Sequence, residues 1–114
     1  MPKNNPLNLN PLQLKTLTLL QAIAHLEGFS KPAEADGERD IVQMPHAHGD
    51  HFHVGDALVM ARDATGLNNP AVWTVLERKG LVRTNFPESA TMTAEGLAYD
   101  TGLADEVLHK GGHH

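Results

Sequence analysis

The stretch from Gly55 to Asp100 places the tightest limits on the fold, because its start and stop signals are closely spaced. Asn69-Pro70 is a helix start: asparagine caps the first turn, and proline at the first helical position lacks only an N–H that would be unpaired anyway. Gly80 is the matching stop. A strand-like run from Leu81 to Thr84 and a return strand at Thr91-Met92 follow. The stretch therefore predicts a short helix, a sharp turn and a β-hairpin in direct succession.

Two further helices are predicted before this unit and one after it. Asn10-Pro11 repeats the cap-and-proline start, and apolar residues recur at helical spacing as far as Gly28. The segment from Gly55 to Ala64 is expected to form the second helix, which Thr65-Gly66-Leu67 breaks. Thr93-Ala94-Glu95 is expected to start the last helix.

Leu14 and Leu17 lie away from the apolar stripe of the first helix. A helix this rich in leucine can bury a second face against another copy of the chain, which would make these two residues a dimer contact. It can also present one wide face to its own core. The sequence leaves both alternatives open.

The chain has 114 residues, no cysteine and a net charge of −5. These values limit it to one domain without disulfides, thiolate metal sites or a strong basic surface. Residues 10–108 are expected to form this domain, residues 1–9 a flexible arm, residues 30–40 a polar surface loop and residues 109–114 a disordered tail. No apolar run is long enough to cross a membrane and no signal-peptide pattern is visible at the start, so we expect a cytoplasmic protein.

The most unusual chemistry lies between Pro45 and Val54, where four histidines alternate with other residues. If Gly49-Asp50 forms a two-residue hairpin turn, all four imidazoles fall on one face of the hairpin. Imidazoles placed in this way can converge on Zn²⁺, Ni²⁺ or Cu²⁺, and Asp50 can act as a fifth group or accept a hydrogen bond from a ligand. The alternative is an exposed strand face whose polar residues are histidines. The candidate metal ligands are His46, His48, His51, His53 and Asp50.

In this hairpin His48 would face His51, and His46 would face His53. Without a metal, the cluster would repel itself once protonated, which predicts a hairpin that loosens as the pH falls through about 6.5. Residues 46–51 also resemble the HxHxDH signature of the metallo-β-lactamase fold, which binds zinc for hydrolysis. That fold needs a much longer chain and later ligands that have no positions here, so we interpret this match as fortuitous.

Residues 64–82, ATGLNNPAVWTVLERKGLV, and residues 91–100, TMTAEGLAYD, resemble the winged helix-turn-helix family of bacterial transcription regulators. With the first helix, the resemblance covers residues 10–100. It implies an α+β fold, a winged helix with a three-helix core and a C-terminal β-hairpin wing, plus a histidine-rich hairpin or strand insertion between the first two helices. It implies a DNA-binding regulator and no enzyme, acting as a homodimer because small domains of this kind read two half-sites.

In that family the third helix lies in the major groove of duplex DNA, and the wing touches the backbone or the minor groove. The outer face of the corresponding helix here carries one arginine beside one glutamate, whereas phosphate and guanine contacts favour several basic groups. A non-enzymatic protein-interaction module of the same fold is therefore the alternative, with Trp73 either as a contact residue or as half-buried core. The resemblance places DNA contacts at Asn68, Asn69, Ala71, Thr74, Arg78 and Arg83.

Overall fold

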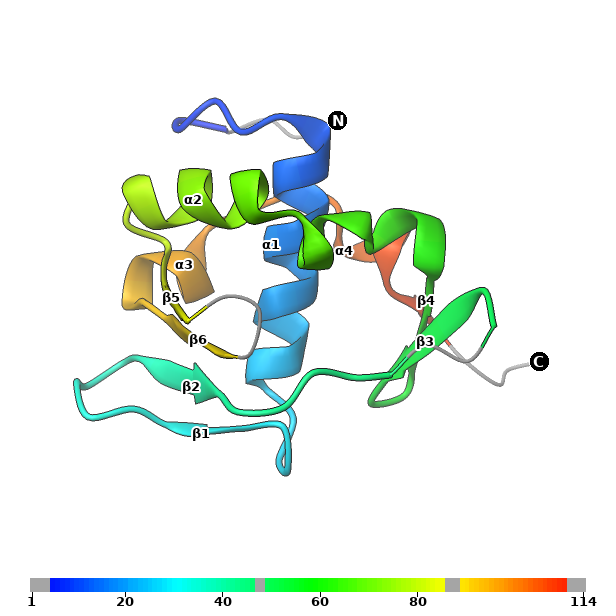
Figure 1. Ribbon diagram of the computed structural model, residues 1–114, viewed down its shortest axis with the longest axis horizontal. Coiled ribbons are helices and arrows are strands. Elements are labelled where there is room, and N and C mark those ends of the chain that lie inside the picture. Colours follow the sequence, from blue (N-terminus) through cyan, green and yellow to red (C-terminus); the bar gives the residue numbers. More distant parts are fainter. Residues whose placement is uncertain (1–4, 47–48, 86–88, 111–114) are drawn as a thin grey trace.

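The computed structural model describes residues 5–46, 49–85 and 89–110 and has a mixed α+β fold arranged around one central helix (Figure 1). The α+β class predicted from the sequence is confirmed. The helices are α1 (Pro11–Ala24), α2 (Pro70–Arg78), α3 (Ala94–Ala98) and α4 (Ala104–Val107), with 3₁₀ helices η1 (Ala61–Asp63) and η2 (Thr65–Asn68). The strands are β1 (Ser30–Pro32), β2 (Arg39–Ile41), β3 (His51–Val54), β4 (Ala57–Met60), β5 (Val82–Asn85), β6 (Ser89–Met92) and β7 (His109–Lys110).

The central helix α1 begins where the sequence predicts. The side chain of Asn10 accepts a hydrogen bond from the Gln13 N–H at 2.8 Å, and the Gln13 side chain accepts one from the Asn10 N–H at 2.9 Å. This reciprocal capping box fixes the first turn. The helix ends at Ala24, sooner than predicted. Helices and strands from the rest of the chain contact α1, so Leu14 and Leu17 are both buried within the chain and present no exposed surface to a second copy.

The first sheet has the strand order β1-β2-β6-β5. Its first two strands form at the two ends of the segment that the sequence predicts as a surface loop, so that prediction is wrong there and holds for residues 33–38 between them. β2 pairs with β6, which places Ile41 opposite Ala90 and Arg39 opposite Met92. Ile41 and Met92 are completely buried. The polar segment becomes a strand because a partner far along the chain completes its hydrogen bonds, which local composition does not indicate.

The second sheet, with strand order β3-β4-β7, overturns two predictions. The segment from Gly55 to Ala64 is not a helix: it completes a turn, forms β4 and continues into η1. The turn of this hairpin is Gly55-Asp56, so the partner that the structure gives β3 is β4, whereas the prediction placed the partner before Gly49. Gly55 has a φ of +61°, which glycine adopts without strain. In Figure 1 this hairpin lies away from the first sheet, beyond α1.

The pairing differs from the prediction because the chain contains the pair Gly-Asp twice, at residues 49–50 and again at residues 55–56. Either pair suits a tight turn. Pro45 has no N–H to donate to a strand ladder, whereas β4 donates its backbone groups and buries Val59 completely. Both pairs lie in turns, and the second pair joins β3 to β4, so the apolar run from Ala57 to Met60 is a strand of four residues.

The predicted succession of helix, turn and hairpin is confirmed in α2, β5 and β6. Gly80 has a φ of +80° where the chain turns out of α2. Residues 86–88, at the tip of the predicted wing, lie outside the described part of the chain. The predicted start of the last helix is also confirmed, because the Thr93 hydroxyl oxygen accepts a hydrogen bond from the Gly96 N–H at 2.9 Å. The same hydroxyl donates to the carbonyl oxygen of Gly80 at 2.8 Å.

Residues 5–9, part of the predicted flexible arm, are joined to the domain by hydrogen bonds. The Leu7 N–H donates to the Tyr99 hydroxyl at 3.1 Å, and the Lys79 ammonium donates to the Leu7 carbonyl at 2.8 Å. At the other end, β7 occupies the first two residues of the predicted tail, and residues 1–4 and 111–114 lie outside the described residues. Among the described helices, none is long and apolar enough to cross a membrane.

Candidate nucleic-acid interface

Helix α2 crosses α1 with one face buried and the other exposed (Figure 1). Val72, Trp73 and Leu76 form the buried face. Trp73 is only 1% exposed, and its indole N–H donates to the Leu67 carbonyl at 3.1 Å. The tryptophan therefore belongs to the core, and the interpretation of Trp73 as a surface contact residue is wrong.

The outward-facing residues predicted for DNA contact lie around α2. Asn68, Ala71, Thr74 and Arg78 are exposed. Asn69 is half-buried, and its side-chain oxygen accepts a hydrogen bond from the Ala71 N–H at 3.0 Å, so it serves as the helix cap. These residues share one surface of the chain. Arg83 lies apart from them, on the hairpin that follows.

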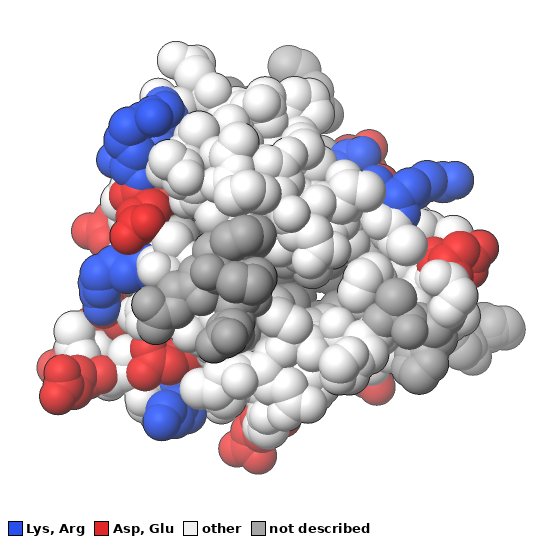
Figure 2. All heavy atoms as spheres, in the orientation of Figure 1, with Lys and Arg blue, Asp and Glu red and all other residues white. Residues whose placement is uncertain are grey.

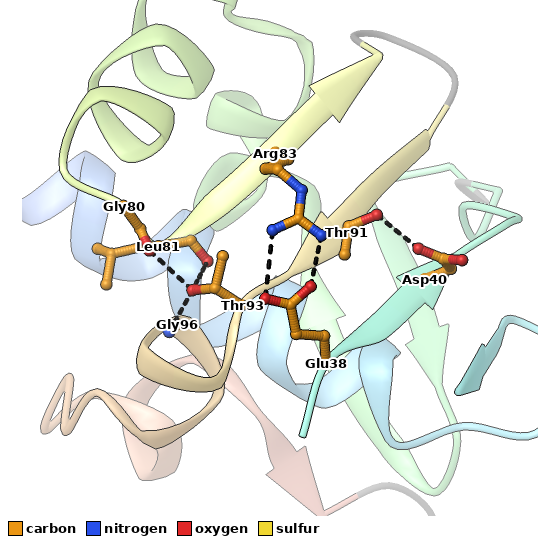
Figure 3. A network of polar contacts seen from close by, with 8 residues as sticks. All are labelled: Glu38, Asp40, Gly80, Leu81, Arg83, Thr91, Thr93 and Gly96. Carbon is orange, nitrogen blue, oxygen red and sulfur yellow. Dashed lines mark hydrogen bonds and ion pairs between the residues drawn. The ribbon is translucent and has the colours of Figure 1, made fainter. Parts of the chain in front are cut away.

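Arg83 lies beside two acidic residues that come from the segment of β2 (Figure 3). Its guanidinium donates to both carboxylate oxygens of Glu38, one of them at 3.2 Å. Thr91 lies between β2 and β5 in register: it is directly opposite Arg83 on one side and Asp40 on the other. The Thr91 hydroxyl donates to the Asp40 carboxylate. One face of the sheet therefore carries a row of side chains in which the arginine charge is balanced by carboxylates.

The hydrogen bonds from Arg83 lower the pKa of Glu38 below its ordinary value, because they stabilise the ionised carboxylate. Contact with Glu38 raises the pKa of Arg83 in turn, so both groups keep their charge at neutral pH. The sequence analysis did not identify Glu38 or Asp40 as partners of the hairpin. A signal was present, because residues i and i+2 of a strand share one face, and the order Glu38-Arg39-Asp40 places both acids together.

The opposite side of β2 has a structural role. The Arg39 guanidinium donates to the Ala24 carbonyl at 2.7 Å and to the Ser30 hydroxyl at 3.0 Å. Ala24 is the last residue of α1, so Arg39 satisfies a carbonyl that the helix leaves without an intrahelical partner. The two arginines of this sheet thus have different roles. Arg39 donates to a carbonyl at the end of α1, and Arg83 pairs with Glu38 at the surface.

Figure 2 shows the face on which α2 lies. Among the described residues in this view, lysine, arginine and acidic side chains are interspersed around the margin, and the atoms over α2 are mostly uncharged. Lys79 keeps its positive charge at the end of α2, and its ammonium is directed to the Leu7 carbonyl, to which it donates at 2.8 Å. This surface can make uncharged hydrogen bonds through Asn68 and Thr74 and one charged contact through Arg78.

The predicted histidine cluster does not assemble as expected. His51 and His53 lie on β3, with ring centroids 5.0 Å apart and ring planes at 88°. His46 is exposed and precedes the strand, and His48 lies outside the described residues. Asp50 Oδ1 lies 3.4 Å from Nδ1 of His51. In β3 His53 faces Leu58 and His51 faces Met60, and His46 lies outside any strand, so the predicted facing of His46 with His53 is wrong. The predicted facing of His48 with His51 lies outside the described residues.

No group of three or more His, Cys, Asp or Glu side chains within the described residues is placed to hold a metal ion. The chain matches no protein-family model, no curated protein and no solved structure. Its function is therefore argued from the arrangement of its own side chains.

Proposed function

We propose that the chain is a small winged-helix domain that binds duplex DNA through the outer face of α2. The observation that carries the proposal is the two-sided character of α2: its inner face is buried on α1, its outer face is exposed, and a hairpin follows it directly. A helix held in this way can enter a major groove while its buried face keeps the domain intact. The function is non-enzymatic.

The proposed contacts follow from the chemistry of the exposed residues. Asn68 and Thr74 are suited to hydrogen bonds with base edges or phosphate oxygens, and Arg78 to guanine or phosphate. Ala71 offers a small surface that lets the helix approach closely. Arg83 contributes less, because Glu38 already neutralises its charge. The domain is therefore expected to bind with modest affinity.

Two copies binding adjacent half-sites would raise that affinity. Contact between the copies would not involve Leu14 or Leu17, because both are buried within one chain. The mass of the protein–DNA complex, measured by analytical ultracentrifugation, distinguishes one bound copy from two.

The test is selection from a random duplex library at low ionic strength, followed by a gel-shift assay. Arg78→Glu is expected to weaken binding by at least about tenfold, because it replaces an attractive contact with repulsion. Arg62→Glu is the matched control, since Arg62 is exposed on η1 and the change in net charge is the same. The proposal fails if no duplex is retarded, or if the two variants weaken binding equally.

A protein-interaction module of the same fold is the second candidate. It is favoured by the mostly uncharged described residues over α2 and by the pairing of Arg83 with Glu38. A photo-crosslinking amino acid at the exposed position of Thr74 distinguishes the two candidates in cells. Crosslinking to DNA supports the first. Crosslinking to one protein, together with no retardation of any duplex, supports the second.

A further inference from the structure

The outer face of the β3–β4 hairpin brings two imidazoles and a thioether together. β3 and β4 are paired so that His51 is directly opposite Met60 and His53 is opposite Leu58. Directly opposite residues share a face of the sheet, with Cβ atoms about 5 Å apart. His51 and His53 also share a face, because they are two residues apart on one strand. His51, His53, Leu58 and Met60 therefore occupy the same side of the hairpin.

Burial identifies this side as the outer one. Val54 and Val59, on the other side of the hairpin, are 5% and 0% exposed and belong to the hydrophobic core. His53 is exposed, and His51 and Met60 are partly exposed. The Met60 thioether therefore lies on the same outer side of the hairpin as the two imidazoles, opposite His51.

From this cross-strand register we propose that His51, His53 and Met60 form a binding site for monovalent copper. The two rings are edge to face with centroids 5.0 Å apart, so small side-chain rotations bring one nitrogen of each ring to a shared ion. Imidazole and thioether are both ligands for copper, and the soft sulfur selects Cu(I) over the harder divalent ions. Zinc sites instead use thiolate, imidazole and carboxylate, and this chain has no cysteine.

The carboxylate of Asp50 lies next to the ring of His51. Its Oδ1 atom lies 3.4 Å from Nδ1 of that ring. A carboxylate at one ring nitrogen fixes the orientation of a metal-binding histidine, which assigns the copper to Nε2 of His51. The site differs from the predicted four-histidine cluster in its third ligand, which comes from β4 and not from residues 45–48.

The test is an anaerobic titration of the full chain with Cu(I), followed by NMR of methionine labelled with ¹³C at its methyl group. The Met60 methyl and the rings of His51 and His53 are expected to shift together and to saturate at one copper ion per chain. Met92, which is completely buried, is the internal reference and is expected to stay unchanged. A titration with Zn²⁺ is expected to leave the Met60 methyl unshifted.

Affinity is measured by competition with a chromogenic Cu(I) chelator. Met60→Leu, which conserves volume, is expected to weaken Cu(I) binding by about tenfold or more. Met44→Leu and His25→Ala are the controls, because these residues belong to neither β3 nor β4, and the changes are expected to leave the affinity unchanged. An unshifted Met60 methyl, or equal affinity of the Met60→Leu variant and the unaltered chain, would overturn the proposal. Cu(I) binding that shifts only histidines other than His51 and His53 would also overturn the proposal.

Discussion

Gly96 has no space for a side chain, because α3 lies directly against the backbone at Leu81. A Cβ atom at Gly96 would lie 1.9 Å from the Leu81 carbonyl oxygen, and a backbone atom cannot move aside as a flexible side chain can. Glycine-to-alanine changes inside helices usually stabilise, by up to about 1 kcal/mol. At Gly96 the close approach of the Leu81 carbonyl makes the change to alanine destabilising instead.

Gly96→Ala is therefore expected to lower the free energy of unfolding by about 2 kcal/mol, as overpacking of a close contact does. Urea denaturation followed by circular dichroism measures this. Glu95→Ala is the control at the neighbouring exposed position and is expected to stay within about 0.5 kcal/mol of the unaltered chain. If Gly96→Ala were neutral or stabilising, the contact between α3 and Leu81 would be wrong.

The pairing of Glu38 with Arg83 predicts a pH dependence of stability. The pKa of Glu38 is lower in the folded chain than in the unfolded chain. Its contribution to stability is therefore complete above the unfolded value of about 4.3, and it is lost as the pH falls through the lower, folded value.

The difference in unfolding free energy between the unaltered chain and Glu38→Gln is thus expected to be constant above about pH 5 and to shrink as the pH falls below about 4. Urea denaturation over this pH range measures it. Glu34→Gln removes the same charge from an exposed position in the same segment and serves as the control. A difference that does not change with pH would show that the ion pair does not form in solution.

At the scale of elements, Thr93 joins β6, α3 and the turn after α2 through one hydroxyl group. That hydroxyl accepts from the Gly96 N–H and donates to the Gly80 carbonyl. Thr93→Val keeps the shape of the side chain and removes both bonds, so it is expected to lower the free energy of unfolding by about 1–2 kcal/mol. Thr65→Val, at an exposed position, is the control in the same denaturation experiment. Equal stability of both variants would contradict the capping role.

The elements that the sequence predicts correctly are those whose signals are local. Asn10-Pro11, Asn69-Pro70 and Gly80 each fix a helix end through the backbone of adjacent residues, and all three act as predicted. The predicted second helix is wrong because residues 57–60 pair with β3 and bury Val59. That pairing is set by tertiary contacts, which spacing along the chain does not show.

At the scale of the whole molecule, part of the candidate interface follows from local sequence signals and part depends on tertiary contacts. The outward direction of Thr74 and Arg78 follows from helical periodicity, and the structure exposes both. The neutralisation of Arg83 could not be foreseen in the same manner. Glu38 is far from Arg83 in the sequence, and only the pairing of β2 with β6 brings the carboxylate to the hairpin. The charge of the proposed interface is therefore a property of the assembled sheet.

This distribution of charge predicts how DNA binding depends on salt, if α2 is the DNA-binding helix. Of the two arginines in the proposed interface, Arg78 is exposed and Arg83 is paired with Glu38. Each phosphate neutralised by a basic group contributes about −0.9 to the slope of log affinity against log salt concentration. The expected slope is therefore about −1 for each bound chain, which is shallow for a DNA-binding domain.

Glu38→Gln releases Arg83 for a phosphate contact, so it is expected to tighten binding at low salt and to steepen the slope to about −2 for each bound chain. Fluorescence anisotropy with the selected duplex at several salt concentrations measures both quantities. Glu34→Gln changes the net charge equally without touching Arg83, so it separates the local effect from the general one. If both variants steepened the slope alike, the carboxylate of Glu38 would act only through net charge. A change confined to Glu38→Gln would identify its ion pair as the group that sets the affinity of the hairpin for DNA.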